Sequence, residues 1–248
     1  MSKALLQSLR PASTLHSFRP IPRRSFLTIP GTEAQKLSAT RILPYKHTSL
    51  YTVIADIDSY SSFLPYCLES KVTKWSAPDK DGKRWPSEAD LKVGWGGYEE
   101  TFTSRLFCDP NSTVEALGGE ARTSLTKADI GHHSETFDSP AVANNIFKSL
   151  STVWTIRPFH YKPPSGKPQT DKAVLPPRDQ TEVHLAIDFQ FANPIYAALS
   201  KAVAPKVAGI MIEAFEVRAR KLLDGPGHGV KEKDPLDHVF SAGKKIGA

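Results

Sequence analysis

Side chains that could do chemistry are few in this sequence and do not form a catalytic pattern. His132 and His133 are adjacent, but no further ligands follow at the spacing that a metal site uses. Glu99 and Glu100 are neighbours in a predicted strand, so their carboxylates point to opposite faces and cannot act on one substrate. The sequence has no Gly-x-Ser-x-Gly elbow, no phosphate-binding loop and no His-Glu-x-x-His motif. We therefore predict no catalytic residue, no metal site and no cofactor.

Positive charge is concentrated at the N-terminus. The 248 residues carry a formal net charge of +6. The first 32 residues hold no acid and five cations, which are Lys3, Arg10, Arg19, Arg23 and Arg24. Without these five the chain is nearly neutral, and binding to nucleic-acid phosphates needs a concentrated basic surface. We therefore predict that nucleic acid is not a partner.

The same N-terminal segment has the composition of a mitochondrial transit peptide. Its cations are interspersed with serines and leucines, and it lacks the continuous apolar core of a secretory signal. Arg24-Ser25-Phe26 resembles a matrix processing site, so cleavage is expected near Phe26. We predict a transit peptide and linker over residues 1–38, a folded domain over 39–224 and a disordered tail over 225–248. In the reducing matrix, Cys67 and Cys108 are expected to remain free thiols.

The periodicity of the domain predicts one strand, two helices and about six further strands. Residues 39–45 are expected to form the first strand, 50–57 an amphipathic helix capped by Thr48 or Ser49, and 60–64 a short second helix. Alternating patterns predict the later strands at 69–76, 88–93, 98–107, 113–117, 146–158 and 181–191. Two segments without a regular period, 118–145 and 161–180, are expected to be insertions.

A long helix is expected at the end of the domain, from Asn193 to Leu223. Asn193 is a favourable N-cap, and Pro194 suits the first helical position because its missing N–H would be unpaired there. Apolar residues then follow helical spacing, and they are Ile195, Leu199, Ala202, Val203, Val207, Ile210, Met211, Ala214 and Phe215. The helix would be about 40 Å long, with a kink at Pro205.

This order of elements predicts an α+β fold, with a curved antiparallel sheet packed on a long C-terminal helix. Antiparallel strands need a cover for their apolar face, and the terminal helix is the one predicted element long enough to supply it. A curved sheet that grips one helix leaves a space between them, where a ligand would bind. The apolar residues of the helix either line that space or fill a solid core, and the periodicity does not distinguish the two.

Three segments carry a resemblance to a known family. They are Val53 to Cys67, with its acid, tyrosine, phenylalanine, proline and cysteine at fixed intervals, Phe147 to Trp154, and Ala204 to Glu216. With the order of elements, they make residues 40–223 resemble the START-like superfamily, also called the helix-grip or polyketide-cyclase-like fold. More narrowly, the chain resembles the coenzyme Q-binding branch of that superfamily, which is found in mitochondria.

The resemblance implies a bound lipid instead of a reaction. It implies a chaperone that holds coenzyme Q (ubiquinone) or its isoprenoid precursors and is not an enzyme. The ligand-binding residues that it implies are Val203, Val207, Ile210, Met211 and Phe215 on the last helix, Tyr60, Phe63 and Pro65 near the first helices, and Trp95 on a glycine-flanked turn. Trp95 either sits at a membrane interface or folds back over the core.

The resemblance also implies a location and partners, and it leaves alternatives open. The protein would lie peripherally on the matrix side of the mitochondrial inner membrane, deliver quinone to respiratory complexes and support ubiquinone biosynthesis. One alternative is a START-fold cyclase-type enzyme acting on a polyketide or quinone intermediate, since a fold does not determine a function. Another is a partner-binding module that associates with ribosomes, since bacterial relatives resemble ribosome-association proteins. The insertions 118–145 and 161–180 either line the mouth of the cavity or are passive.

Overall fold

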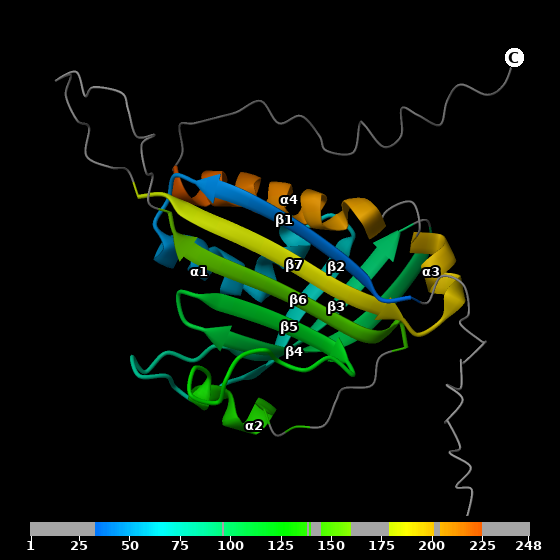
Figure 1. Ribbon diagram of the computed structural model, residues 1–248, viewed down its shortest axis with the longest axis horizontal. Helices are drawn as coiled ribbons and strands as arrows, with labels where there is room; N and C mark the ends of the chain where they lie inside the picture. The colour runs from blue at the N-terminus through cyan, green and yellow to red at the C-terminus, as the bar shows by residue number, and fades with distance from the viewer. Residues whose placement is uncertain are drawn as a thin grey trace, which may run out of the picture.

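The computed structural model describes residues 33–95, 97–137, 139, 145–159, 179–200 and 204–224, with only the backbone of Trp95, Leu199 and Ser200. These ranges contain a seven-stranded antiparallel sheet in the order β1-β7-β6-β5-β4-β3-β2. The sheet bends, so that β2 and β3 run at a steep angle to β1 and β7, and the C-terminal helix lies along β1 (Figure 1). The predicted α+β class is confirmed.

The strands follow the predicted order. They are β1 (Gln35–Leu43), β2 (Cys67–Trp75), β3 (Pro86–Trp95), β4 (Tyr98–Asp109), β5 (Thr113–Gly119), β6 (Phe147–Pro158) and β7 (Thr181–Phe191). Strand β7 has the predicted bounds, and every second residue from Thr181 to Phe191 is buried. Strand β1 begins at Gln35 instead of residue 39, because β7 offers it pairing partners as far as Phe189.

The first helices differ from the prediction at their ends. Helix α1 spans His47–Ala55, and the 3₁₀ helix η1 spans Ile57–Ser62. The predicted N-cap is wrong, because Lys46 occupies the capping position and Thr48 and Ser49 lie inside the first turn. In the described part of the chain, no helix combines the length and the apolar character needed to cross a bilayer.

The predicted C-terminal helix from Asn193 to Leu223 is not continuous, and its interruption lies at Pro205, where the sequence predicted a kink. Helix α3 (Pro194–Ser200) comes first, then the 3₁₀ helix η3 (Ala204–Lys206), then α4 (Val207–Leu223). A proline lacks the N–H of the helical ladder and its ring clashes with the preceding turn. The longest part, α4, is therefore about 26 Å long. The predicted cap is confirmed, since Asn193 Oδ1 accepts a hydrogen bond of 2.8 Å from the Ile195 N–H.

The insertion after β5 covers the convex face of the sheet. It contains the 3₁₀ helix η2 (Gly131–His133) and the short helix α2 (Ser134–Phe137). Its apolar side chains Ala121 and Ile130 are buried against Phe107 and Leu117 of β4 and β5. In Figure 1, α2 lies beyond β4, on the far side of the sheet from α4. The described part of this insertion therefore covers the outside of the sheet, whereas residues 160–178 lie outside the described residues.

The adjacent histidines of the insertion bind the backbone of β4. His133 Nε2 accepts a hydrogen bond of 3.1 Å from the Cys108 N–H, and His132 Nε2 lies 3.0 Å from the Cys108 carbonyl oxygen. The N–H and the carbonyl of Cys108 belong to the end of β4 that continues beyond Arg105, the last residue of β4 that pairs with β3. A buried strand edge must have its hydrogen bonds satisfied, so these two imidazoles have a structural role.

We expect the protein to lose stability in mild acid through His133. Burial, with the neighbouring His132, lowers the pKa of His133 from 6.5 to about 3. The unfolded chain takes up a proton near pH 6.5 and the folded chain does not, so stability present above that pH is lost as the pH falls toward 3. Urea unfolding should show a loss of about 1–2 kcal/mol between about pH 6.5 and 5 from this residue. His133→Gln, whose amide oxygen can accept the same hydrogen bond, should remove that loss; an unchanged pH profile would contradict the assignment.

Gly119 ends β5 in a conformation that only glycine adopts without strain. Its φ is +59°, and a Cβ would lie 2.3 Å from the Lys148 carbonyl oxygen of β6. We expect Gly119→Ala to lower the free energy of unfolding by about 2–4 kcal/mol, measured by urea denaturation. The control is Gly209→Ala in α4, where no atom lies within 4 Å of the added Cβ. That variant should gain about 0.5–1 kcal/mol, because alanine favours a helix. Equal effects at both sites would refute this interpretation.

Candidate functional site

The register of the strands decides which residues face the interior. Directly paired residues share a face, and pairing places Ala116, Thr152 and Ile187 in one row across β5, β6 and β7. Trp154 lies on the same face as Thr152, and its ring centroid is 5.0 Å from that of Phe215 on α4. This row therefore faces the C-terminal helix, and we call this side the inner face.

Aromatic rings connect the segment after α1 to the inner face. The ring centroids of Tyr60 and Phe63 are 5.7 Å apart, and those of Phe63 and Phe215 are 6.0 Å apart, both edge to face. Phe215 in turn reaches Trp154 of β6. Edge-to-face pairs at these distances add to the burial of apolar area. The chain of rings therefore fixes α4 relative to η1 and the sheet.

Some interior residues remain partly exposed although their neighbours are buried. We call this set the inner surface, and it consists of Phe63, Leu91, Phe102, Ala116, Thr152, Val207, Met211 and Ala214. Phe63 and Met211 pack against both of two buried clusters, one built around β6, β7 and α1 and the other around η1 and β3. The inner surface is therefore partly accessible. Its own side chains are apolar apart from the Thr152 hydroxyl, and the Arg218 guanidinium lies 5.6 Å from the centroid of the Phe63 ring.

The predicted ligand-binding residues of the last helix have different environments. Val207, Ile210 and Met211 are partly exposed, and Val207 and Met211 pack against the buried core. Phe215 is only 1% exposed and lies between Phe63 and Trp154, so it fills the core. Val203 lies outside the described residues. The structure thus places Val207, Met211 and Phe63 against the same buried cluster, and their contact with a ligand remains a prediction.

The other predicted ligand-binding residues also differ in how far they are buried. Phe63 belongs to the inner surface, and Pro65 is half-buried in the turn between η1 and β2. Tyr60 is buried and donates a hydrogen bond to the Ile54 carbonyl oxygen, which locks it into the first helices. Trp95 is the last residue of β3 and pairs with Tyr98, and its side chain lies outside the described residues.

Sequence reasoning missed the part of the inner surface that the sheet contributes. Leu91, Phe102, Ala116 and Thr152 come from four strands, β3 to β6, and meet through the register. The alternation within each strand separates its two faces. Phe102 could have been selected from the alternation, because it is a large apolar residue in a strand whose first residues are polar. The alternation does not say, however, which face of the strand is the inner one.

A polar pair lies at one end of the inner face. The Tyr196 hydroxyl of α3 donates a hydrogen bond of 2.6 Å to Glu100 Oε1 of β4. This bond, together with partial burial, raises the pKa of Tyr196. Glu99, the neighbour of Glu100, forms an ion pair with Lys92 at 2.8 Å instead. Adjacent residues of a strand point to opposite faces, so the two carboxylates have different partners. The Tyr196–Glu100 bond therefore connects α3 to the β3–β4 hairpin at this end.

The thiols near the interior are not set up for chemistry. Both cysteines are free and buried. Burial raises the pKa of Cys67 to about 11 and that of Cys108 to about 12, so both remain protonated at neutral pH and are poor nucleophiles. Within the described ranges, no group of three or more histidine, cysteine, aspartate or glutamate residues could hold a metal ion. The arrangement as a whole suits apolar binding.

Comparison with known proteins agrees with this geometry. Residues 43–216 match the family described as polyketide cyclase / dehydrase and lipid transport. The "Coenzyme Q-binding protein coq10, mitochondrial" of Schizosaccharomyces pombe is 32% identical over 73% of this chain and 85% of its own length. The "Coenzyme Q-binding protein COQ10, mitochondrial" of Eremothecium gossypii is 27% identical over 82% of this chain and 81% of its own.

A solved structure shares the fold at low sequence identity. It is a START superfamily protein from Mycobacterium smegmatis, with a TM-score of 0.50 and 14% identity, and the match covers 75% of this chain and 98% of that one. At this identity the likeness concerns the fold alone. The family match spans most of the folded part, and the fungal relative covers nearly three quarters of the chain. The chain therefore belongs to the polyketide cyclase / dehydrase and lipid transport family, and within it to the COQ10-like coenzyme Q-binding proteins.

Proposed function

We propose that the protein binds coenzyme Q and shelters the isoprenoid tail between the sheet and α4. The names of its relatives support the identity of the ligand. The single observation that carries the proposal is the partial exposure of Phe63 and Met211, which lie between two buried clusters instead of inside either one. Met211 is well suited to this position because its unbranched, flexible side chain adapts to an irregular ligand.

The physical need for such a protein follows from the ligand. Each methylene-sized group exposed to water costs about 0.8 kcal/mol, so a polyisoprenoid leaves a bilayer very slowly without help. A protein that covers even part of the tail lowers this barrier. A buried polar group without a partner would cost about 1–3 kcal/mol, and among the residues of the inner surface Thr152 alone carries a polar side chain. The inner surface therefore favours a methyl-branched chain over a polar ligand.

We further propose that the end carrying the Tyr196–Glu100 pair is where the protein meets the membrane. Tyr98 is 55% exposed and Ile195 is 61% exposed, and the hydrogen bond between Tyr196 and Glu100 holds their two segments together. Leu68, which is also exposed, lies beside Gly94 of the same hairpin. We call Leu68, Tyr98 and Ile195 the hairpin-end patch. Apolar and tyrosine side chains of this kind partition into the interface of a bilayer.

The proposed location is the matrix side of the mitochondrial inner membrane. The relatives named above are mitochondrial proteins, and the acid-free, arginine-rich segment 1–32 has the composition of a transit peptide. At this membrane the protein would deliver quinone to respiratory complexes and support ubiquinone biosynthesis. Import of a fusion carrying residues 1–38, followed by sequencing of the mature N-terminus, tests both the address and the expected processing near Phe26.

We propose that the protein acts by binding and not by catalysis. The neutral, protonated thiols and the apolar inner surface support this, as do relatives that are named for binding. Conversion of a quinone or polyketide intermediate by the pure protein would instead establish the cyclase-type alternative. Co-sedimentation with mitochondrial ribosomes that survives loss of lipid binding would establish the ribosome-associating alternative.

The experiment that tests the proposal is mass spectrometry of the lipids that co-purify with the protein from mitochondria. We expect coenzyme Q or an isoprenoid precursor at a near-stoichiometric level, enriched over its share of the mitochondrial lipids. The control is the Val217→Glu variant, which should retain as much quinone as the wild type. Val217 is half-exposed on α4 and does not belong to the inner surface. An extract that contains bulk phospholipid but no quinone would sink the proposal.

A further inference from the structure

The convex face of the sheet carries a polar cleft that lies apart from the inner surface. A cleft of about 220 Å³ opens where the insertion after β5 meets the edge of β2 and β3. It is lined by Lys74, Trp75, Ser76, Ala77, Ser87, Glu88, Arg105, His132, Glu135, Thr136 and Ser139. The lining holds two cations, two carboxylates and four hydroxyl residues, which suits a polar ligand and not the isoprenoid tail.

Arg105 of β4 is the unusual residue of the cleft. It is only 4% exposed, although its guanidinium carries a full charge. One Nη2 hydrogen bond of 2.7 Å goes to the Ala121 carbonyl oxygen, and one weaker Nη1 bond of 3.3 Å goes to the Ser139 carbonyl oxygen. The Nε–H is buried and has no hydrogen-bond partner. The guanidinium therefore has donors that the protein leaves unused.

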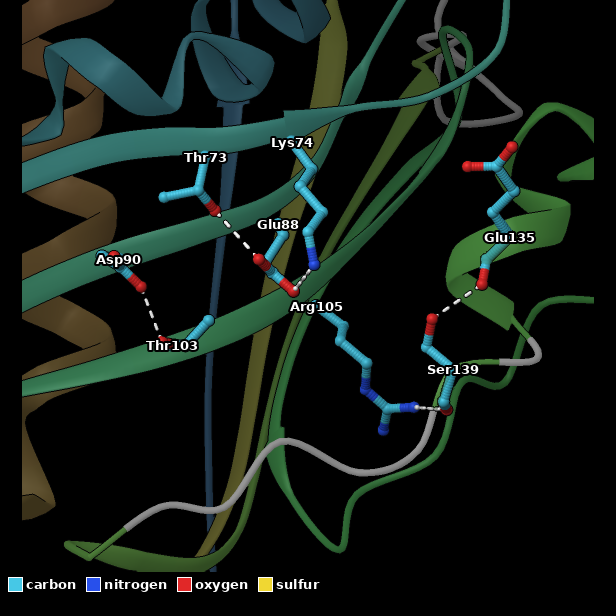
Figure 2. A network of polar contacts seen from close by, with 8 residues as sticks. All are labelled: Thr73, Lys74, Glu88, Asp90, Thr103, Arg105, Glu135 and Ser139. Carbon is cyan, nitrogen blue, oxygen red and sulfur yellow. Dashed lines mark hydrogen bonds and ion pairs between the residues drawn. The ribbon is translucent and has the colours of Figure 1, made fainter.

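The described acids near Arg105 do not pair with its guanidinium. Glu88 is paired with Arg105 in the strand register, but its carboxylate accepts bonds from Lys74 Nζ at 2.9 Å and Thr73 Oγ1 at 3.1 Å. Asp90, further along β3, is held by Thr103. Figure 2 shows the guanidinium extending away from Glu88 toward Ser139, with the Glu135 carboxylate turned away from it. In the described parts of the chain, no carboxylate forms an ion pair with Arg105.

A buried guanidinium without an anion is unfavourable, because proteins pair buried charges or leave them in water. Burial, with the nearby Arg122, lowers the pKa of Arg105, which reflects this unfavourable environment. A planar guanidinium presents two parallel N–H groups, and these match the two oxygens of a carboxylate or a phosphate. The geometry points to a binding site for a small oxyanion, a phosphate or carboxylate group, with Arg105 as its charged anchor in a cleft that Lys74 and Thr136 also line.

The test is isothermal titration calorimetry of the full chain in a buffer that contains no oxyanion ligand, with sodium phosphate in one arm and sodium acetate in the other. Sodium chloride at matched ionic strength controls for screening and for general salt effects. Saturable binding in either arm supports the proposal and identifies the preferred group. We expect Arg105→Met to weaken that binding at least about tenfold, since it removes a charge-assisted pair.

Matched variants separate the anchor from general effects. Arg105→Lys retains the charge but loses the planar fork, so it should bind with intermediate strength. Lys92→Met removes a cation that pairs with Glu99 outside the cleft, and its binding should equal that of the wild type. Arg105→Met should fold, because it replaces an unpaired buried charge by an apolar side chain of similar length. Equal binding by the wild type and Arg105→Met would overturn the proposal.

A measurement on the wild type alone makes the test independent of any variant. In a ¹H–¹⁵N spectrum, addition of phosphate or acetate should shift the amide signals of the cleft, around Arg105 and His132, while those of α4 remain in place. Signals that fail to shift with either anion would also overturn the proposal. Quinone retention should be unaffected in Arg105→Met, so the oxyanion site and the proposed quinone site succeed or fail separately.

Discussion

Met211→Glu is expected to abolish quinone retention while the protein stays folded. Met211 is partly exposed on α4 and, like Phe63, packs against both buried clusters. A carboxylate there would have to lose its hydration when a tail covers it, which is far more costly than a missing contact. Quinone in the purified protein, measured by mass spectrometry, should fall at least about tenfold, which corresponds to about 1.4 kcal/mol or more.

The matched control for this variant is Val217→Glu on the same helix. Val217 is 50% exposed, so the new charge remains in water and quinone retention should equal that of the wild type. Circular dichroism and urea unfolding of both variants separate loss of ligand from loss of fold. If a folded Met211→Glu protein carries as much quinone as the control, Met211 does not face the ligand.

The double variant Tyr98→Ser with Ile195→Ser is expected to weaken binding to membranes strongly. Both side chains are more than half exposed at the end of the molecule where α3 meets the β3–β4 hairpin. Burying a large apolar side chain is worth about 1.5–3 kcal/mol when it is complete, so two partly inserted side chains should contribute about 2 kcal/mol. Sedimentation with vesicles of phosphatidylcholine and cardiolipin should therefore fall by about 10- to 30-fold.

The control for the membrane prediction uses apolar residues at the other end of the molecule. Ile42 of β1 and Leu222 of α4 are about as exposed as Tyr98, and both elements end opposite α3 (Figure 1). Ile42→Ser with Leu222→Ser should leave vesicle binding unchanged. A larger loss in this control than in the hairpin-end double variant would mean that the protein approaches the membrane from the opposite end.

The fold was largely predictable because its strongest signals are local. The alternation of Val183, Leu185, Ile187 and Phe189 predicted β7 with its bounds, and Asn193-Pro194 predicted the start of α3. The prediction of one unbroken C-terminal helix failed, because two local preferences compete in that segment. The apolar stripe continues through Pro205 and suggested one helix with a kink there, whereas the missing N–H and the steric clash of the ring divide it into α3 and α4.

The sequence predicted residues of the candidate site on α4 and, through the family resemblance, Phe63, but none on the sheet. The stripe of α4 identified Val207 and Met211, because helical spacing selects a face directly. The same stripe did not separate Phe215, which fills the core, from its partly exposed neighbours, since that depends on packing against Phe63 and Trp154. Phe102 and Thr152 were missed because long-range pairing decides which face of a strand becomes the inner one.

The position of the insertion also could not be read from its composition. Residues 118–145 have no regular period, yet Ala121 and Ile130 are buried against β4 and β5. The sequence assigned no role to the two histidines, and in the fold they hydrogen-bond the Cys108 backbone. Whether a residue is buried, and whether a strand edge needs hydrogen-bond partners, depends on the folded chain. Neither the packing of the insertion nor the role of the two histidines therefore has a local sequence pattern.

Photo-crosslinking is the most direct measurement of where the tail lies. A coenzyme Q analogue with a diazirine on its isoprenoid chain would be bound, irradiated and mapped by peptide mass spectrometry. Labelled residues should belong to the inner surface, with Phe63, Phe102 and Met211 foremost. Labels concentrated on the insertion of the convex face, around Leu125 and Phe137, would place the quinone outside the space between the sheet and α4 and contradict the account.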